Sequence, residues 1–169
     1  MTSSENVVAP IEAKSVRAAI LAIDYGRARL GLAIAEASSK MAQPLGALDR
    51  VNRNEDMRRL RELVHEHGVK QIVVGLPLRL DGTRGSMAEE AERFARRVRK
   101  QLGVQVELAD ERLTSWEAER LLEETQGRFL RAEKAAGRKR RNPPPKVTVD
   151  SVAAAVILKE FLERGQAAG

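Results

Sequence analysis

Residues 18–36 have the sequence AAILAIDYGRARLGLAIAE, which indicates two paired strands. The continuous small and apolar run at residues 18–23 is typical of a strand that is buried on both faces of a sheet. This run ends at an Asp-Tyr-Gly sequence (24–26), and alternating apolar residues begin again at Leu30. We therefore expect an antiparallel hairpin with its turn at residues 26–29.

Apolar spacing beyond the hairpin predicts one more strand and then alternating helices and strands. Gly68 and Gly103 are expected to end two of the helices. Ser86 with Glu89 fits a capping box at the start of one helix, and Met87 is expected on its buried face. The predicted elements are a strand at 44–51, a helix around 57–67, a strand at 71–74, a helix at 86–102, a strand at 104–110, a helix capped by Thr114 with Glu117, and a last helix from about 149 to 163. This order predicts an α/β fold, in which a three-stranded antiparallel meander and then parallel strands form a mixed five-stranded sheet with helices on both faces.

Length and composition bound the class of protein. The 169 residues fit one domain, which we place at residues 18–164 between a disordered N-terminal tail (1–17) and a short C-terminal tail (165–169). The absence of cysteine excludes disulfides and thiolate metal sites, and it suits a reducing cytoplasm. No apolar run reaches the roughly 20 residues of a membrane span, so we expect no membrane partner.

Positive charge is concentrated in one segment of the sequence. The chain carries 30 basic and 24 acidic residues, but residues 128–146 alone hold eight basic residues and one acidic residue. That segment therefore has a charge of +7, and the remaining 150 residues together have −1. Its centre is Arg138-Lys139-Arg140-Arg141, which we interpret as a flexible loop that contacts nucleic-acid phosphates. Only five aromatic residues are present, too few for a base-stacking platform, so such contacts should involve the backbone.

Acidic residues stand at the ends of three predicted elements. Asp24 ends the first strand, Asp110-Glu111 ends the fifth strand, and Asp150 begins the last helix. Each has a local explanation when taken alone, such as a turn hydrogen bond or a favourable interaction with the helix dipole. Strand ends are, however, where sites form in open α/β sheets, and carboxylates are the ligands that Mg²⁺ and Mn²⁺ prefer. We therefore expect a site for a hard divalent cation.

Five motifs along the chain resemble those of one known family. In chain order they are Ile23-Asp24-Tyr25-Gly26 with Arg29 and Gly31, Gln43-Pro44-Leu45, Val73-Val74-Gly75-Leu76-Pro77 with Asp81-Gly82 and Gly85, Asp110-Glu111-Arg112-Leu113-Thr114-Ser115 with Glu117-Ala118, and Val149-Asp150-Ser151 with Ala153-Ala154 and Ile157-Leu158. This ordered set is similar to the YqgF-type family, whose members are described as Holliday-junction-resolvase-like proteins and as candidate pre-16S rRNA nucleases.

The resemblance implies an RNase H-like fold and a set of site residues. It implies Asp24, Glu111 and Asp150 as both catalytic residues and metal ligands, because related nucleases hold two divalent ions between such carboxylates. Strand alternation leaves open whether Asp110 or Glu111 faces the metal, and the resemblance favours Glu111. Arg29, near the hairpin turn, is a candidate phosphate contact together with the basic loop.

The function that these features imply is metal-dependent cleavage of nucleic acid. We expect an endonuclease that processes the 5′ end of pre-16S rRNA with Mg²⁺ or Mn²⁺, and that acts in the cytoplasm on structured pre-rRNA or ribosomal particles. Two alternatives remain open, a Holliday-junction DNA resolvase and a non-catalytic rRNA-binding assembly factor. A resolvase would require a two-fold dimer to match its two-fold substrate, and the sequence is compatible with a monomer or a homodimer.

Overall fold

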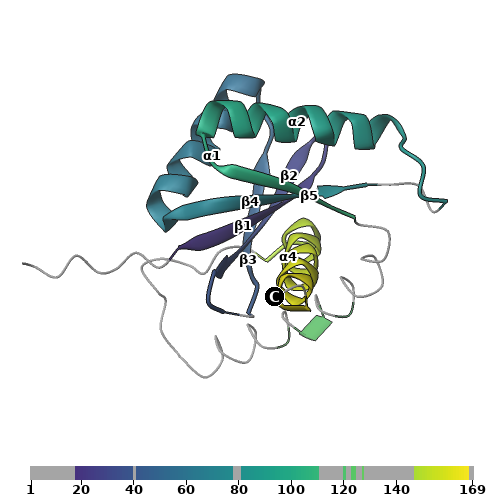
Figure 1. Ribbon diagram of the computed structural model, residues 1–169. Helices are drawn as coiled ribbons and strands as arrows, with labels where there is room; N and C mark the ends of the chain where they lie inside the picture. The colour runs from purple at the N-terminus through teal and green to yellow at the C-terminus, as the bar shows by residue number, and fades with distance from the viewer. Residues whose placement is uncertain are drawn as a thin grey trace, which may run out of the picture.

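The computed structural model describes residues 18–39, 41–77, 81–110, 120, 123–124, 127 and 147–167. Within these ranges the chain forms one five-stranded sheet with helices on both faces (Figure 1). The elements are β1 (Ala19–Tyr25), β2 (Arg29–Glu36), β3 (Gln43–Asp49), α1 (Arg53–His67), β4 (Val69–Leu76), α2 (Ser86–Leu102), β5 (Gln105–Asp110) and α4 (Val149–Ala167). The predicted cap of Thr114 with Glu117 and the basic segment 128–146 lie outside the described residues.

The sheet has the mixed topology that the sequence predicts. Its strand order is β3-β2-β1-β4-β5. β1 pairs antiparallel with β2, and β2 pairs antiparallel with β3, whereas β1 pairs parallel with β4 and β4 with β5. β1 is therefore the central strand, which explains why its sequence is apolar without alternation. The carboxyl ends of β1, β4 and β5 meet at one edge.

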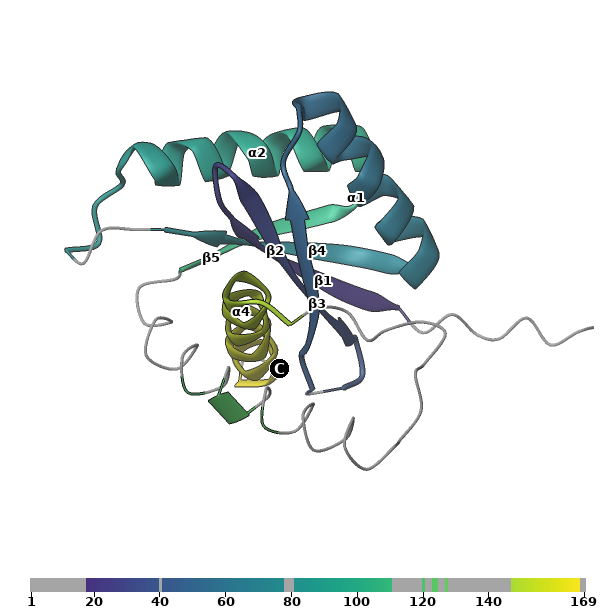
Figure 2. The same ribbon diagram turned by 180° about the vertical axis from the view of Figure 1, so that it is seen from behind.

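One face of the sheet packs against α1 and α2, which lie on the side opposite α4 (Figures 1 and 2). Phe94 and Val98 of α2 and Leu60 of α1 are buried against alternate residues of the central strands. These strand residues are Leu21 and Ile23 of β1, Leu30 and Leu32 of β2, and Ile72 and Val74 of β4. Burial of this apolar surface is the main contribution to the stability of this layer.

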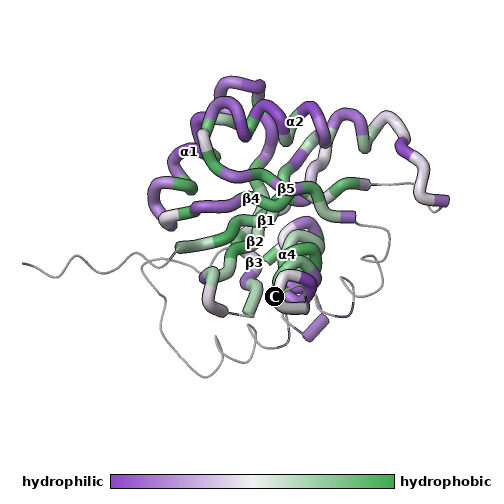
Figure 3. The backbone as a smooth tube through the Cα atoms, in the orientation of Figure 1, coloured by the Kyte–Doolittle hydropathy of each residue, from purple (hydrophilic) through white to green (hydrophobic). Residues whose placement is uncertain are grey.

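The other face packs against α4, and several of its strand residues are alanines. Ala22 of β1 and Ala33 and Ala35 of β2 contact a cluster that contains Ile157 and Leu158. Small strand residues let a helix approach the sheet closely, so the side chains of α4 fill the space between the two layers. α4 is apolar around most of its circumference in Figure 3, as expected for a helix that is buried on more than one side. No helix in the described part of the chain is long and apolar enough to cross a membrane.

The predicted ends of α1 and α2 are confirmed. Gly68 and Gly103 adopt left-handed conformations, with φ of 62° and 65°. Glycine adopts this conformation without the steric penalty that a Cβ atom brings, so each residue ends its helix. α4 continues to Ala167, past the predicted end near residue 163, and so includes residues 165–167 that we assigned to the C-terminal tail.

The predicted cap of α2 is wrong by one residue, although the helix spans residues 86–102 as predicted. Gly85 is the N-cap, in an extended conformation, and Ser86 is already the first helical residue. The amide of Glu89 donates to the carbonyl of Gly85 at 3.2 Å, so Glu89 stands four residues after the cap, not three, and no capping box forms. Met87, which we expected on the buried face, is half-buried, and its neighbour Ala88 has no exposed surface.

Candidate active site

Asp24 lies near the carboxyl end of β1, on the face of the sheet that α4 covers. Side chains alternate along a strand, and Ile20 and Ala22 both belong to the cluster under α4. Asp24 continues this series and is partly buried. In the antiparallel pairing of β1 with β2, its direct partner is Gly31.

Asp150 reaches the same place from the other end of the chain. A Cβ atom built on Gly31 would lie 2.1 Å from the carbonyl oxygen of Asp150 and 2.9 Å from its Cβ. Such distances do not occur between atoms that are not bonded, so only glycine at this position lets the first turn of α4 rest on β2. Because Gly31 is the cross-strand partner of Asp24, Asp24 and Asp150 lie next to each other on one face.

The first turn of α4 is held by a reciprocal cap that the sequence interpretation missed. The amide of Ser151 donates to Oγ1 of Thr148 at 3.1 Å, and the amide of Thr148 donates to Oγ of Ser151 at 2.8 Å. Ser151 is completely buried. The spacing Thr-x-x-Ser is the only sequence signal of this cap, in which serine takes the role that Glu or Gln has in a capping box. The cap fixes the backbone that carries Asp150.

Arg29 contacts Asp150 directly. Its Nε lies 3.3 Å from Oδ2 of Asp150, and the two side chains are 60% and 36% exposed. Arg29 is two residues before Gly31 in β2 and therefore shares the α4-facing side of the strand. An exposed pair of this kind adds little to stability. The pair places the guanidinium of Arg29 beside the Asp150 carboxylate and leaves most of the Arg29 side chain exposed.

The acidic pair at the end of β5 is described only in part. Asp110 is the last residue of β5 and pairs with Leu76 of β4. Ala109 belongs to the cluster under α4, so alternation places Asp110 on the opposite face from Asp24. Glu111 lies outside the described residues, as do Arg138, Lys139, Arg140 and Arg141.

No complete metal site is present among the described residues. In the ranges 18–39, 41–77, 81–110 and 147–167, no three histidine, aspartate or glutamate side chains are placed to hold a metal ion together. Asp110, which is within these ranges, therefore does not complete a site with Asp24 and Asp150. Asp24 and Asp150 each carry the carboxylate oxygens that Mg²⁺ and Mn²⁺ prefer as ligands.

The mixed five-stranded sheet of order β3-β2-β1-β4-β5, with helices on both faces, defines an RNase H-like fold. RuvC from Thermus thermophilus shares this fold, with a TM-score of 0.53 at 14% identity over 88% of this chain and 96% of RuvC. A sequence model of the RuvX family, described as Holliday junction resolvase, matches residues 18–164. The chain belongs to the RuvX family, and the resemblance to YqgF-type proteins is confirmed.

Three relatives from different organisms match most of the chain. A protein of Koribacter versatilis is 37% identical over 153 residues, which are 90% of this chain and 92% of the relative. A protein of Anaeromyxobacter sp. (strain K) is 41% identical over 85% of this chain and 96% of its own length. A protein of Chloroflexus aurantiacus is 38% identical over 85% and 86%. All three are named "Putative pre-16S rRNA nuclease", which agrees with the nuclease class that the motifs predict.

Proposed function

We propose that this protein is a divalent-metal-dependent endonuclease that processes the 5′ end of pre-16S rRNA in the cytoplasm. The observation that carries this proposal is the placement of the first turn of α4 on Gly31, which puts Asp150 beside Asp24. The names of the relatives support the choice of RNA substrate. An aspartate near the end of a central strand and a second one on the adjoining first turn of a helix are suited to bind a cation that contacts phosphate oxygens.

Asp24 and Asp150 would hold Mg²⁺ or Mn²⁺ together with Glu111, which follows β5 directly. A bound ion supplies an activated water and stabilises charge on the phosphate oxygens. Glu111 is the natural third ligand, because Asp110 lies on the other face of β5 and does not complete the site.

Arg29 would orient Asp150 and contact the substrate. Its ion pair with Asp150 leaves the side chain 60% exposed, so its remaining N–H groups are able to donate to a phosphate of the strand being cleaved. Arg138, Lys139, Arg140 and Arg141 would add further phosphate contacts from the basic segment. These contacts position nucleic acid without reading its sequence.

Branched DNA is the second candidate substrate, because the family is described as Holliday junction resolvase. The distinguishing experiment gives the full chain both substrates side by side, a labelled pre-16S leader RNA and a four-way DNA junction. Each is incubated with Mg²⁺ or Mn²⁺, and with EDTA as the control. We expect divalent-ion-dependent cleavage of the RNA near the mature 5′ end.

Each other outcome selects a different function. Cleavage of the junction alone would make the protein a resolvase. Binding of the leader RNA without cleavage under either ion would make it a non-catalytic assembly factor.

A further inference from the structure

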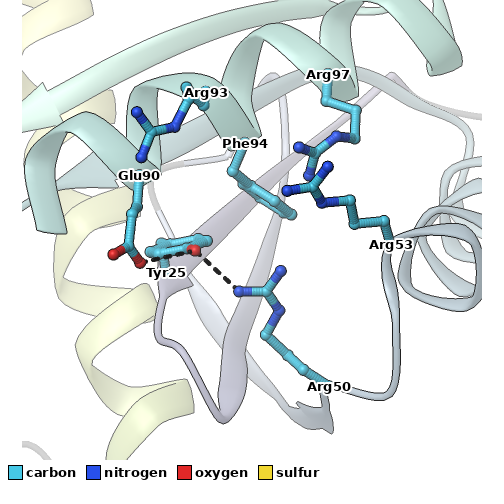
Figure 4. A pocket seen from close by; sticks show the side chains of 7 residues that line it. All are labelled: Tyr25, Arg50, Arg53, Glu90, Arg93, Phe94 and Arg97. Atoms are coloured by element: carbon cyan, nitrogen blue, oxygen red, sulfur yellow. Dashed lines mark hydrogen bonds between the residues drawn. The ribbon is translucent and has the colours of Figure 1, made fainter.

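A second charged site lies on the face of the sheet opposite Asp24 and Asp150. It is a pocket of about 260 Å³ at the carboxyl end of β1, between the start of α1 and the middle of α2 (Figure 4). Four arginines from two separate parts of the chain line it together with one carboxylate and two aromatic rings. These residues are Arg50, Arg53, Arg93, Arg97, Glu90, Tyr25 and Phe94.

Internal contacts fix the position of Arg50 in this pocket, which we name the arginine pocket after its four arginines. Its guanidinium donates to the Tyr25 hydroxyl at 2.9 Å, to the carbonyl of Gly26 at 3.1 Å and to Oδ2 of Asp56 at 3.1 Å. The Asp56 side chain is only 4% exposed and that of Arg50 only 16%. The charge of Arg50 is therefore matched inside the protein, and its position does not depend on a ligand.

The aromatic rings are not available for stacking with a base. Phe94 is 1% exposed and lies against Tyr25, with 5.2 Å between the ring centroids. The guanidinium of Arg50 covers both rings, at 5.0 Å from that of Tyr25 and 5.7 Å from that of Phe94. The chemistry that the pocket offers to a ligand is therefore positive charge and N–H donors.

Three of the arginines form no close ion pair with a carboxylate among the described residues, although the hydrogen bond from Arg27 and then, to a lesser degree, the charge of Arg93 lower the pKa of Glu90. Arg53, Arg93 and Arg97 form no ion pair there, and Glu90 is engaged by Arg27, whose Nε and terminal nitrogen donate to it at 3.1 and 2.8 Å. Figure 4 shows the guanidinium groups of Arg53 and Arg97 directed toward the same space. Burial, and then repulsion from Arg53 and Arg50, hold the pKa of Arg97 below its usual value. A bound anion would remove this repulsion.

We propose that the arginine pocket binds a backbone phosphate of the nucleic acid whose cleavage is proposed above, so this inference rests on that proposed function. Guanidinium groups donate in a planar fork that matches two oxygens of a phosphate. Tyr25 lines the pocket and directly follows Asp24 in β1, so the pocket and the acids lie at the same end of the same strand, on opposite faces. A strand bound at the acids continues around the end of the β1–β2 hairpin to reach the pocket.

Binding in EDTA tests this contact separately from cleavage. The pocket variant is Arg53→Gln, Arg93→Gln and Arg97→Gln in one full chain. The matched control is Arg61→Gln, Arg96→Gln and Arg99→Gln, which removes the same charge from exposed positions of the same two helices. The affinity of each protein for the leader RNA and for the four-way junction is measured at several salt concentrations.

We expect the pocket variant to bind at least about tenfold more weakly than the control, and its log–log salt slope to be smaller by about 0.7–0.9, as for one lost phosphate contact. Its melting temperature should not fall below that of the control, since the substitutions remove like charges that repel one another. Equal affinities of the two variants for both nucleic acids would overturn the proposal.

A melting measurement of the wild type with added inorganic phosphate tests whether the pocket binds a free anion instead of contacting nucleic acid. If phosphate raises the melting temperature of the wild type but the two variants bind nucleic acid equally, the pocket holds a free anion and the proposal is wrong. If the wild type bound the nucleic acids without cleaving them, the proposed nuclease function would be wrong. The proposed phosphate contact in the arginine pocket would not be affected.

Discussion

Asp24 and Tyr25 are neighbours in β1, yet their side chains lie on opposite faces of the sheet. Asp24 lies beside Asp150 under α4, and Tyr25 forms part of the wall of the arginine pocket. This follows from the two-residue period of a strand. A single dipeptide thus connects the proposed catalytic acids with the proposed phosphate site.

Replacing Asp24 tests its proposed role. Asp24→Asn removes the charge but keeps the shape, so we expect leader-RNA cleavage to fall by at least about 100-fold while thermal unfolding remains cooperative. The matched control is Glu66→Gln, which removes one negative charge from an exposed position of α1 and should leave cleavage unchanged. Full activity of the Asp24 variant would exclude it from the mechanism.

Asp56 stabilises the fold beneath the arginine pocket. It accepts hydrogen bonds from Arg50 and from the amide of Val51, both at 3.1 Å. Asp56→Ala would leave the mostly buried charge of Arg50 unpaired, so the free energy of unfolding in urea should fall by about 3 kcal/mol. Asp49→Ala, at an exposed position, should change it by less than about 0.5 kcal/mol. If the free energy of unfolding changed by a similarly small amount in both variants, the ion pair of Arg50 with Asp56 would not contribute to stability.

At the scale of elements, the position of α4 on β2 determines the candidate active site. The helix begins at a residue fixed by the reciprocal cap of Thr148 with Ser151, and its first turn rests on Gly31. Thr148, Ser151 and Gly31 carry no proposed chemistry themselves, but they determine where Asp150 lies.

The variant Gly31→Ala tests whether cleavage depends on the position of α4 when all the proposed acids are kept. The added methyl group would meet backbone atoms of Asp150, so the first turn of α4 must move away from β2. Because a misplacement of about 1 Å costs about 100-fold in rate, cleavage should fall by that order although every acid is retained. The matched control is Gly165→Ala in the same helix, where a Cβ atom meets nothing within 4 Å. It should keep activity and raise stability slightly; equal activity of the two variants would contradict the role of Gly31.

At the scale of the whole molecule, the proposed acids come from the first strand and the last helix. A divalent ion held by Asp24 and Asp150 would bind only the folded chain, so the stability of the fold should depend on divalent ions. At about 100 times its Kd, an ion that binds only the folded state stabilises it by about 2.7 kcal/mol, which corresponds to roughly 5–10 °C in Tm. Mg²⁺ or Mn²⁺ should therefore raise the Tm of the wild type and of Glu66→Gln but not that of Asp24→Asn. A shift of equal size in all three proteins would place the ion elsewhere.

The basic segment is expected to act on nucleic-acid affinity and not on stability. Replacing Arg138, Lys139, Arg140 and Arg141 with serine should lower the log–log salt slope of leader-RNA binding by about 0.7 for each lost contact, or roughly three in total. The free energy of unfolding in urea should be nearly unchanged. An unaltered slope and affinity would mean that the segment is a solvated loop.

Local patterns in the sequence were sufficient to predict the strands and helices of the described fold. The apolar run at 18–23, the alternation from Leu30 and the glycines at 68 and 103 each report on the residue itself and its near neighbours. The same locality explains the error at α2, because Gly85 and Ser86 are both acceptable caps and only the folded helix selects one. The family of the protein also followed from the sequence, through the order of its motifs.

The tertiary structure alone decided which distant residues meet. Strand register pairs Asp24 with Gly31, and the docking of α4 brings Asp150 and its ion pair with Arg29 to the same place. The net charge outside residues 128–146 is close to zero, so the sequence composition gives no sign that four arginines gather in one pocket. Periods of 2 and 3.6 residues determine the face of an element on which a side chain lies, but not which element packs against that face. That choice depends on sheet order and helix docking, which bring together residues more than a hundred positions apart.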